Sequence, residues 1–286
     1  MAAATTCCLR RGRTPMLESL DIFATIIAAA VLGGAGCALA GYFLSNLRLP
    51  FMGVCLSHAA MAGAVFANLL GVPIWPAAFS TAIAVSFMVG WLAERMRLDL
   101  NVSMGILFSF IMGVAFIGVG LTKGPKTEAL GLIWGSVLLV SRRHVLWTGA
   151  ATLIALLFAI AFGKELKAIL FSRGIAASSG VREKLVYYLL LLVSGLVITV
   201  NLEAIGGLML FSLLVAPPAA ACRLSRRYWT SLGLSMGLGA AAALGGLAVS
   251  YALNAPAGAS IVVVASAIFA LSAVLTEKGR QRHVAL

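Results

Sequence analysis

The sequence predicts an all-α integral membrane protein, a polytopic bundle of about eight to nine transmembrane helices. Of its 286 residues, 62% are hydrophobic and only 10% are charged, whereas about a quarter of the residues in a soluble domain are charged. Uncharged windows run for 19 residues from Ser103 to Leu121 and for 25 residues from Ser231 to Ala255. Such windows cross a hydrocarbon core about 30 Å thick as helices. No window alternates as a membrane barrel strand would, so helix is the form that satisfies the backbone in lipid.

Nine apolar segments are expected to form these helices. They cover residues 20–46, 53–70, 77–92, 103–121, 146–163, 184–201, 208–222, 231–253 and 259–276. A further stretch, Leu130 to Val140, is too short to span comfortably and suggests an outer-face or re-entrant helix. The whole of residues 16–277 is expected to form a single transmembrane domain. Residues 1–15 are expected to be a disordered tail, or a mis-assigned start before Met16, and residues 278–286 a basic cytoplasmic tail.

The placement of basic residues predicts the orientation in the cell membrane. The net charge is +12, but without interleaved aromatic residues it does not indicate a nucleic-acid partner. Cytoplasmic loops of membrane proteins carry an excess of Lys and Arg. Residues 94–97, 164–184, 223–227 and 278–282 are therefore placed inside. Residues 72–76, 122–128 and 254–258 are then outside the cell membrane. The basic run Arg142-Arg143-His144 is also placed outside, which is an exception to this charge distribution.

The loop 164–184 is the most informative segment outside the apolar windows. It has basic ends around a short, mildly amphipathic core. An ordinary cytoplasmic loop and a short helix that docks on a soluble partner both fit this pattern.

Small residues suggest close helix packing. The first segment contains Gly33, Gly34, Gly36 and Gly41. In the eighth segment, Gly233 and Gly237 form a small-xxx-small pair. Such residues let helix backbones approach in lipid. Packing within one subunit is the simpler explanation.

The sequence contains few of the residue patterns that an enzyme active site needs. The chain has three histidines and no H-E-x-x-H motif. The apolar segments hold no paired carboxylates for acid and base catalysis. Pro125 interrupts a possible phosphate loop at Gly124 to Thr127, so any ATP must be used by a partner. The protein is expected not to be an enzyme and to bind no cofactor tightly.

His58 is the singular polar feature, near the start of the second segment. Cys55 precedes it by three residues, which places both side chains on one side of a helix. Imidazole nitrogen and thiolate sulfur are ligands that zinc prefers. A helix–helix hydrogen bond by His58 and simple packing by Cys55 explain the same pattern. Ionisable residues at membrane depth nonetheless mark transport pathways.

Glu203 lies between two apolar segments, in Asn201 to Leu208. It is interpreted either as a water-facing loop carboxylate or as the entrance of a cation pathway.

Several of these stretches resemble permease subunits of the zinc/manganese/iron family of ATP-binding-cassette importers. The family's F-L-G-D-A-L-S-H-A motif is matched by Phe51 to Ala59. Four further motifs follow in the same order at Met104–Phe108, Gly135–Ser141, Leu213–Ala221 and Pro256–Ile261. The resemblance runs from about Leu20 to Leu275.

The resemblance implies a membrane-spanning subunit that imports a divalent metal ion. It implies three protein partners: a cytoplasmic ATPase, an extracytoplasmic metal-binding protein and a second copy of the chain. The segment around Ala176 and Gly180 resembles the family's coupling loop to the ATPase, with Ser172 and Gly174 where acidic residues are usual.

One departure affects the metal site. The family carries an aspartate four residues before the histidine, and this chain has Val54 there. Either Cys55 replaces the lost carboxylate, which favours zinc over manganese or iron, or His58 binds weakly and the site mostly conducts. An ion-coupled secondary transporter, a permease for a metal chelate and an intramembrane enzyme are the rival interpretations.

Overall fold

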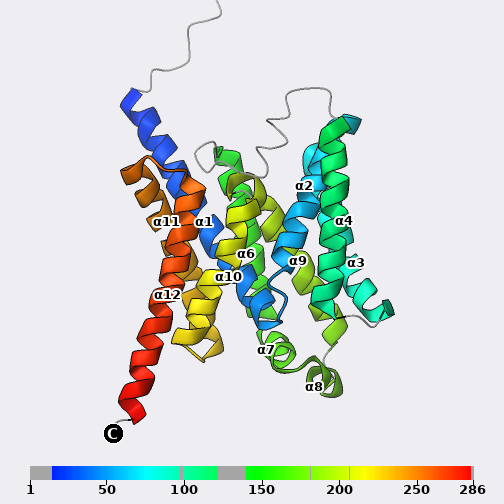
Figure 1. Ribbon diagram of the computed structural model, residues 1–286, viewed down its shortest axis with the longest axis vertical. Coiled ribbons are helices and arrows are strands. Elements are labelled where there is room, and N and C mark those ends of the chain that lie inside the picture. The colour runs from blue at the N-terminus through cyan, green and yellow to red at the C-terminus, as the bar shows by residue number, and fades with distance from the viewer. Residues whose placement is uncertain (1–14, 97–98, 122–139, 181, 206, 285–286) are drawn as a thin grey trace, which may run out of the picture.

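The protein is a bundle of long helices that run between two ends, as the sequence predicts (Figure 1). The structure is a computed structural model, and it describes residues 15–96, 99–121, 140–180, 182–205 and 207–284. The helices are α1 (Pro15–Asn46), α2 (Met52–Leu70), α3 (Ile74–Met96), α4 (Leu100–Leu121), α6 (Arg142–Ala161), α7 (Gly163–Phe171), α8 (Arg173–Ser178), α9 (Glu183–Ile205), α10 (Gly207–Leu224), α11 (Tyr228–Leu253) and α12 (Ala257–Val284).

Eight of the described helices are long and apolar enough to cross a membrane, and α10 is a shorter apolar helix among them. These nine helices cover the nine predicted segments. Their ends differ from the prediction by a few residues because polar residues continue several helices past the hydrocarbon depth. Predicted segment 130–140 falls, but for Val140, on residues outside those that the structure describes, as do residues 1–14.

The two ends of the bundle differ in charge. Helices α7 and α8, the turn between α10 and α11 and the end of α12 lie together at the lower end of Figure 1. Helix α3 also ends there, so all four predicted cytoplasmic segments share one end. The turns α2–α3 and α11–α12 and the start of α6 lie at the opposite end (Figure 1). The protein is thus a multi-pass protein of the cell membrane, and the charge rule predicts that its basic end faces the cytoplasm.

Close packing of α1 against α11 depends on two glycines. A Cβ atom added to Gly34 would lie 2.5 Å from the carbonyl oxygen of Gly239, which is too close for any side chain. The first-segment glycines therefore pack within the subunit, as expected. Gly233 and Gly237 do not, since added Cβ atoms there would meet nothing within 4 Å.

Side-chain hydroxyls connect helices inside the bundle. The Ser235 hydroxyl on α11 donates to the Ala38 carbonyl at 2.9 Å, and the Thr152 hydroxyl on α6 donates to the Leu32 carbonyl at 3.2 Å. Thr81 on α3 donates to the Ala59 carbonyl of α2 at 2.9 Å. Such bonds hold helices together where lipid supplies no hydrophobic drive.

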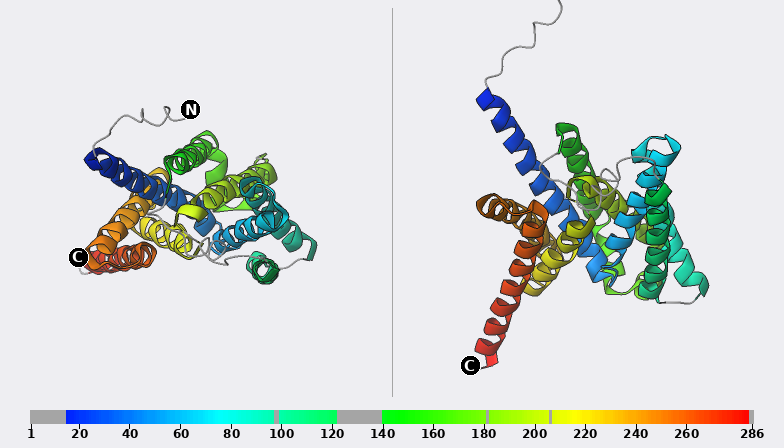
Figure 2. Two further views of the ribbon diagram at one scale, coloured as in Figure 1. Left: turned by 90° about the horizontal axis from the view of Figure 1, so that it is seen from above. Right: turned by 45° about the horizontal axis from the view of Figure 1, so that its top comes forward.

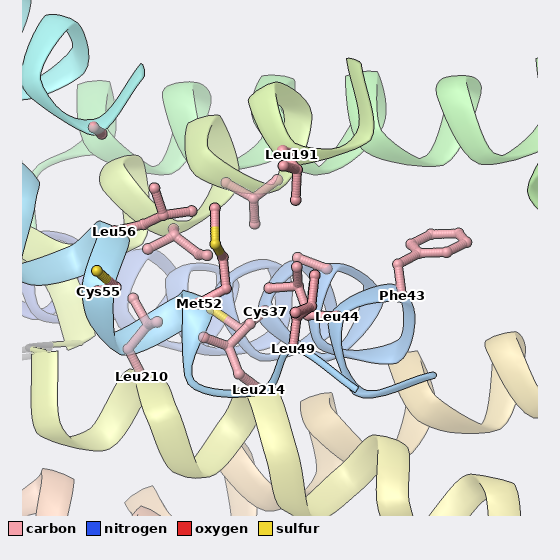
Figure 3. Close-up of a cluster of buried hydrophobic side chains, with 14 of the residues drawn as sticks. Cys37, Phe43, Leu44, Leu49, Met52, Cys55, Leu56, Leu191, Leu210 and Leu214 are labelled. Atoms are coloured by element: carbon pink, nitrogen blue, oxygen red, sulfur yellow. The ribbon is translucent and has the colours of Figure 1, made fainter. Parts of the chain in front are cut away.

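One buried cluster joins most of the helices and contains Cys55. Its centre gathers residues of α1, α2, α9 and α10 (Figure 3). The outer surfaces are also apolar: large exposed side chains include Phe110 on α4, Leu146 on α6 and Val263 on α12. A hydrophobic exterior of this kind is what a bundle surrounded by lipid requires.

Candidate functional site

His58 lies six residues into α2, half-buried, with its ring against α4. The Nδ1 atom is 2.8 Å from the Val54 carbonyl oxygen and 3.3 Å from the Ser57 hydroxyl. The ring packs edge-on against Phe108, with centroids 5.2 Å apart. Within the described part of the chain, Nε2 makes no hydrogen bond. With Nδ1 protonated and donating to Val54, Nε2 carries the lone pair that a metal ion needs.

Cys55 lies in the same α2–α4 contact but is fully buried. Its thiol donates a weak hydrogen bond to the Met104 carbonyl oxygen, with the sulfur 3.8 Å away. Figure 3 shows Cys55 at the edge of the buried cluster, beside Leu56 and Leu210. A thiol held in this way is protonated, whereas a metal ligand is a thiolate. Its role as a ligand stays a prediction that would require the side chain to leave Met104.

The described residues contain no group of three His, Cys, Asp or Glu side chains that could hold a metal ion. Any metal bound at His58 would therefore need ligands from outside these residues, or water.

Glu203 lies in the last turn of α9, at the end of the bundle opposite α7 and α8 (Figure 1). The structure does not describe its side chain. Its role at a pathway entrance stays a prediction.

The segment 164–184, expected to be either an ordinary loop or a short docking helix, forms two short helices, α7 and α8; its docking on a partner stays a prediction. Ala176 is fully buried in α8. Gly180 follows α8, is exposed, and has a φ angle of +79°. The two residues therefore act differently: Ala176 lets α8 pack closely, and Gly180 turns the chain in a conformation that favours glycine.

Two cationic side chains fix this pair of helices to the bundle. Arg173, at the start of α8, donates to Glu183 at 3.1 Å and lies 4.0 Å from the centre of the Tyr187 ring on α9. Lys167 on α7 lies 5.0 Å from the ring centre of Tyr228 and 5.3 Å from that of Trp229, at the start of α11. Helices α7 and α8 are thus tied to two different transmembrane helices.

Sequence reasoning missed the exposed apolar residues of this end. Phe171 is 82% exposed and Ile175 is 54% exposed. Both lie outside the predicted membrane-spanning helices, and exposed apolar residues of this kind often contact a protein partner or a membrane surface. The sequence could have indicated them, because Phe171 and Ile175 are two large apolar residues, four apart, in an otherwise charged loop.

These features define a multi-pass helical membrane protein with two short helices, α7 and α8, at its basic end. The family comparison agrees, because the model of the ABC 3 transport family matches residues 19–276. The chain belongs to the ABC 3 transport family. It is a membrane permease subunit and not itself an enzyme, and membership implies a separate ATPase and a substrate-binding partner.

Proteins similar to this chain are named as transport proteins for manganese, iron or zinc. The chain is 29% identical to the manganese transport system membrane protein MntC of Halalkalibacterium halodurans, over 90% of this chain and 88% of that protein. It is 28% identical to a probable iron transport system membrane protein of Haemophilus influenzae, over 90% and 95%. It is 24% identical to the high-affinity zinc uptake system membrane protein ZnuB of the same organism, over 88% and 96%.

Two solved structures share the fold. PsaBC from Streptococcus pneumoniae in complex with Fab superimposes with a TM-score of 0.79 at 23% identity, over 90% of this chain and 95% of that one. An inward-facing conformation of a putative metal-chelate type ABC transporter gives a TM-score of 0.75 at 17% identity, over 93% and 91%. At these identities the likeness concerns the fold alone.

Proposed function

We propose that this permease subunit moves a divalent transition-metal ion into the cytoplasm and that zinc is its preferred cargo. The observation that carries the proposal is His58. It is the histidine of the family motif, it is half-buried within the bundle, and its Nε2 is free of hydrogen bonds to described residues. Neutral imidazole is a good ligand for zinc and iron.

His58 would bind the ion briefly. The absence of a closed ligand set around it, within the described residues, supports a site that releases its ion. A second copy of the chain would pair with this one in the transporter. Water molecules would fill the remaining positions.

Zinc is proposed on the chemistry of Cys55. Val54 stands where the family has a carboxylate, and carboxylate oxygen is the ligand that manganese favours. If the Cys55 thiol turns from Met104 towards the ion, sulfur and nitrogen together select zinc. The named metals of the relatives include manganese, iron and zinc, so they support a transition metal without selecting one.

The cytoplasmic end would bind the ATPase. Phe171 and Ile175 offer exposed apolar side chains there, and Arg173 and Lys167 hold α7 and α8 against α9 and α11. A movement of the ATPase would reach two transmembrane helices at once. A metal-binding protein would deliver the ion at the opposite end, near the predicted entrance at Glu203.

The test is metal uptake in liposomes that hold the permease, its ATPase and its binding protein. ATP-dependent uptake of free zinc is expected, and His58→Ala should abolish it. His144→Ala is the matched control, because His144 is a buried histidine at the other end of the bundle; it should leave uptake measurable. Uptake driven by a proton gradient without the ATPase, uptake of a chelate only, or normal uptake in His58→Ala would each overturn the proposal.

A further inference from the structure

A cavity of about 480 Å³ opens between α3 and α6, outside the pathway residues discussed above. Helix α3 supplies Trp75 and Phe79, and α6 supplies Arg143 and Trp147. Leu196 of α9 forms part of the floor. Helices α3 and α6 both pack against α9, so the cavity is the cleft that their separation leaves. Its volume lies within the range of about 300–1,000 Å³ that small-molecule sites occupy.

The cleft lies at the outer end of the bundle and opens to the surroundings. Arg143 is the second residue of α6, which begins at the end opposite α7 and α8 (Figure 1). Trp147 is 59% exposed and Trp75 is 39% exposed. Tryptophan is enriched at the level of lipid headgroups. At this depth an exposed apolar cleft faces lipid.

Two contacts lie at the outer end of the cleft. The Trp75 ring lies 6.1 Å from the His144 ring, between centroids, and so connects the start of α3 to the start of α6. The Ser141 hydroxyl accepts from the His144 backbone N–H at 3.3 Å and caps α6 there. These contacts hold the start of α3 close to the start of α6 at one side of the cavity.

Arg143 supplies charge to an otherwise apolar pocket. It is exposed, and among the described residues it has no ion pair or hydrogen bond. A basic residue at the outer end opposes the usual charge distribution of membrane proteins. A planar guanidinium beside an apolar cleft complements a phosphate attached to a hydrocarbon chain.

We propose that this cleft binds an anionic phospholipid of the outer leaflet. One acyl chain fills the cavity over α9, and the headgroup phosphate pairs with Arg143. The proposal accounts for a basic residue that neither the orientation nor metal transport explains. It does not depend on which ion the permease carries.

A second copy of the chain is the competing occupant. In a two-fold contact over the cleft, the Arg143 side chains of both copies would approach one another. Lipid phosphate avoids this repulsion, so charge complementarity favours lipid.

Native mass spectrometry of the detergent-purified full chain tests whether the charge of Arg143 selects an anionic lipid. Phosphatidylglycerol and phosphatidylcholine with identical acyl chains are the probes, and preferential retention of one phosphatidylglycerol is expected. Arg143→Gln should reduce that preference about fivefold, the usual contribution of one basic residue near an anionic surface. Arg226→Gln, an exposed arginine at the cytoplasmic end, should not. Equal retention of both lipids by the natural chain would overturn the proposal.

A second pair of variants tests the cavity. Ala150 lines the pocket and Leu153 on the same helix does not. Ala150→Phe should fill the space and remove the retained lipid, whereas Leu153→Phe should keep it. In membranes, Trp147→Cys on a background without the natural cysteines should not cross-link to a second copy. Retained lipid in Ala150→Phe, or efficient cross-linking through position 147, would refute lipid binding there.

Discussion

The Arg173 guanidinium donates to the Glu183 carboxylate at 3.1 Å and so joins the start of α8 to the start of α9. Both Nε and one terminal nitrogen donate to the same oxygen. The two residues are ten apart in sequence, and the chain between them forms α8 and the turn at Gly180. The ion pair therefore closes the structure that we propose as the ATPase contact.

Breaking this pair should uncouple ATP hydrolysis from transport more than it unfolds the protein. The pair is partly exposed, so its contribution to stability is below about 1 kcal/mol. Glu183→Gln should lower metal-stimulated ATP hydrolysis severalfold in the reconstituted complex, with little change in thermal unfolding. The exchanged pair Arg173→Glu with Glu183→Arg should recover part of the activity. A single variant with unchanged hydrolysis would contradict the role.

Ala176 should not accept a larger side chain. It is fully buried in α8, and overpacking of a tight site costs about 1–3 kcal/mol. Ala176→Leu should displace α8 and weaken ATPase association in a pull-down assay, without loss of membrane insertion. Ala177→Leu is the control, because Ala177 is exposed on the same helix; it should insert and associate unless it touches the ATPase directly.

Gly180 should be sensitive to any Cβ atom, but for a different reason. Nothing lies within 4 Å of a Cβ atom added there, yet its φ angle is +79°. Gly180→Ala would therefore pay backbone strain of roughly 1 kcal/mol rather than a clash. Gly174→Ala lies in α8 without that strain and should be tolerated. Equal rates of ATP hydrolysis in both variants would show that the turn conformation is unimportant.

The contact of α1 with α11 should depend strongly on its glycines. Gly34→Ala would bring a methyl group 2.5 Å from the Gly239 carbonyl oxygen. The helices would have to separate, at a cost of about 1–3 kcal/mol. Thermal unfolding in detergent should show a lower midpoint for Gly34→Ala and little change for Gly237→Ala. A destabilised Gly237→Ala would instead reveal a contact made by another copy.

Cys55→Ala should reduce zinc uptake more than manganese uptake if sulfur takes part in binding. Manganese gains little from sulfur ligands. Restoring the family's carboxylate with Val54→Asp should shift preference towards manganese. Competition uptake with both ions measures the ratio in each variant. Equal losses of both ions in Cys55→Ala would leave Cys55 as a packing residue with a hydrogen bond to Met104.

The helices could be predicted from sequence because hydrocarbon thickness imposes their length. Their rotation could not be predicted, since helices that are apolar on all sides carry no stripe that marks the core. Thus Gly233 and Gly237 have a packing motif but meet nothing, whereas Gly239 makes the close contact. Likewise the spacing of Cys55 and His58 placed them on one side of α2, but only α4 determines that the thiol is buried and the imidazole half-exposed.

The outer cleft was unpredictable for a different reason. It combines Trp75 with Arg143 and Trp147, which are distant in sequence, and it exists because α9 separates α3 from α6. The sequence showed only that Arg142 and Arg143 violate the expected charge distribution.

Helix α4 has fewer neighbours than the helix that carries His58. Its substantial packing, among the described helices, is with α2 and α3, and Figure 2 places it at the periphery of the bundle. Yet its Phe108 covers the His58 ring and its Met104 carbonyl holds the Cys55 thiol. A sideways tilt of α4 would therefore uncover both side chains together, while α1, α9 and α10 kept their mutual contacts. Access to both candidate ligands is therefore governed by one peripheral helix and not by the centre of the bundle.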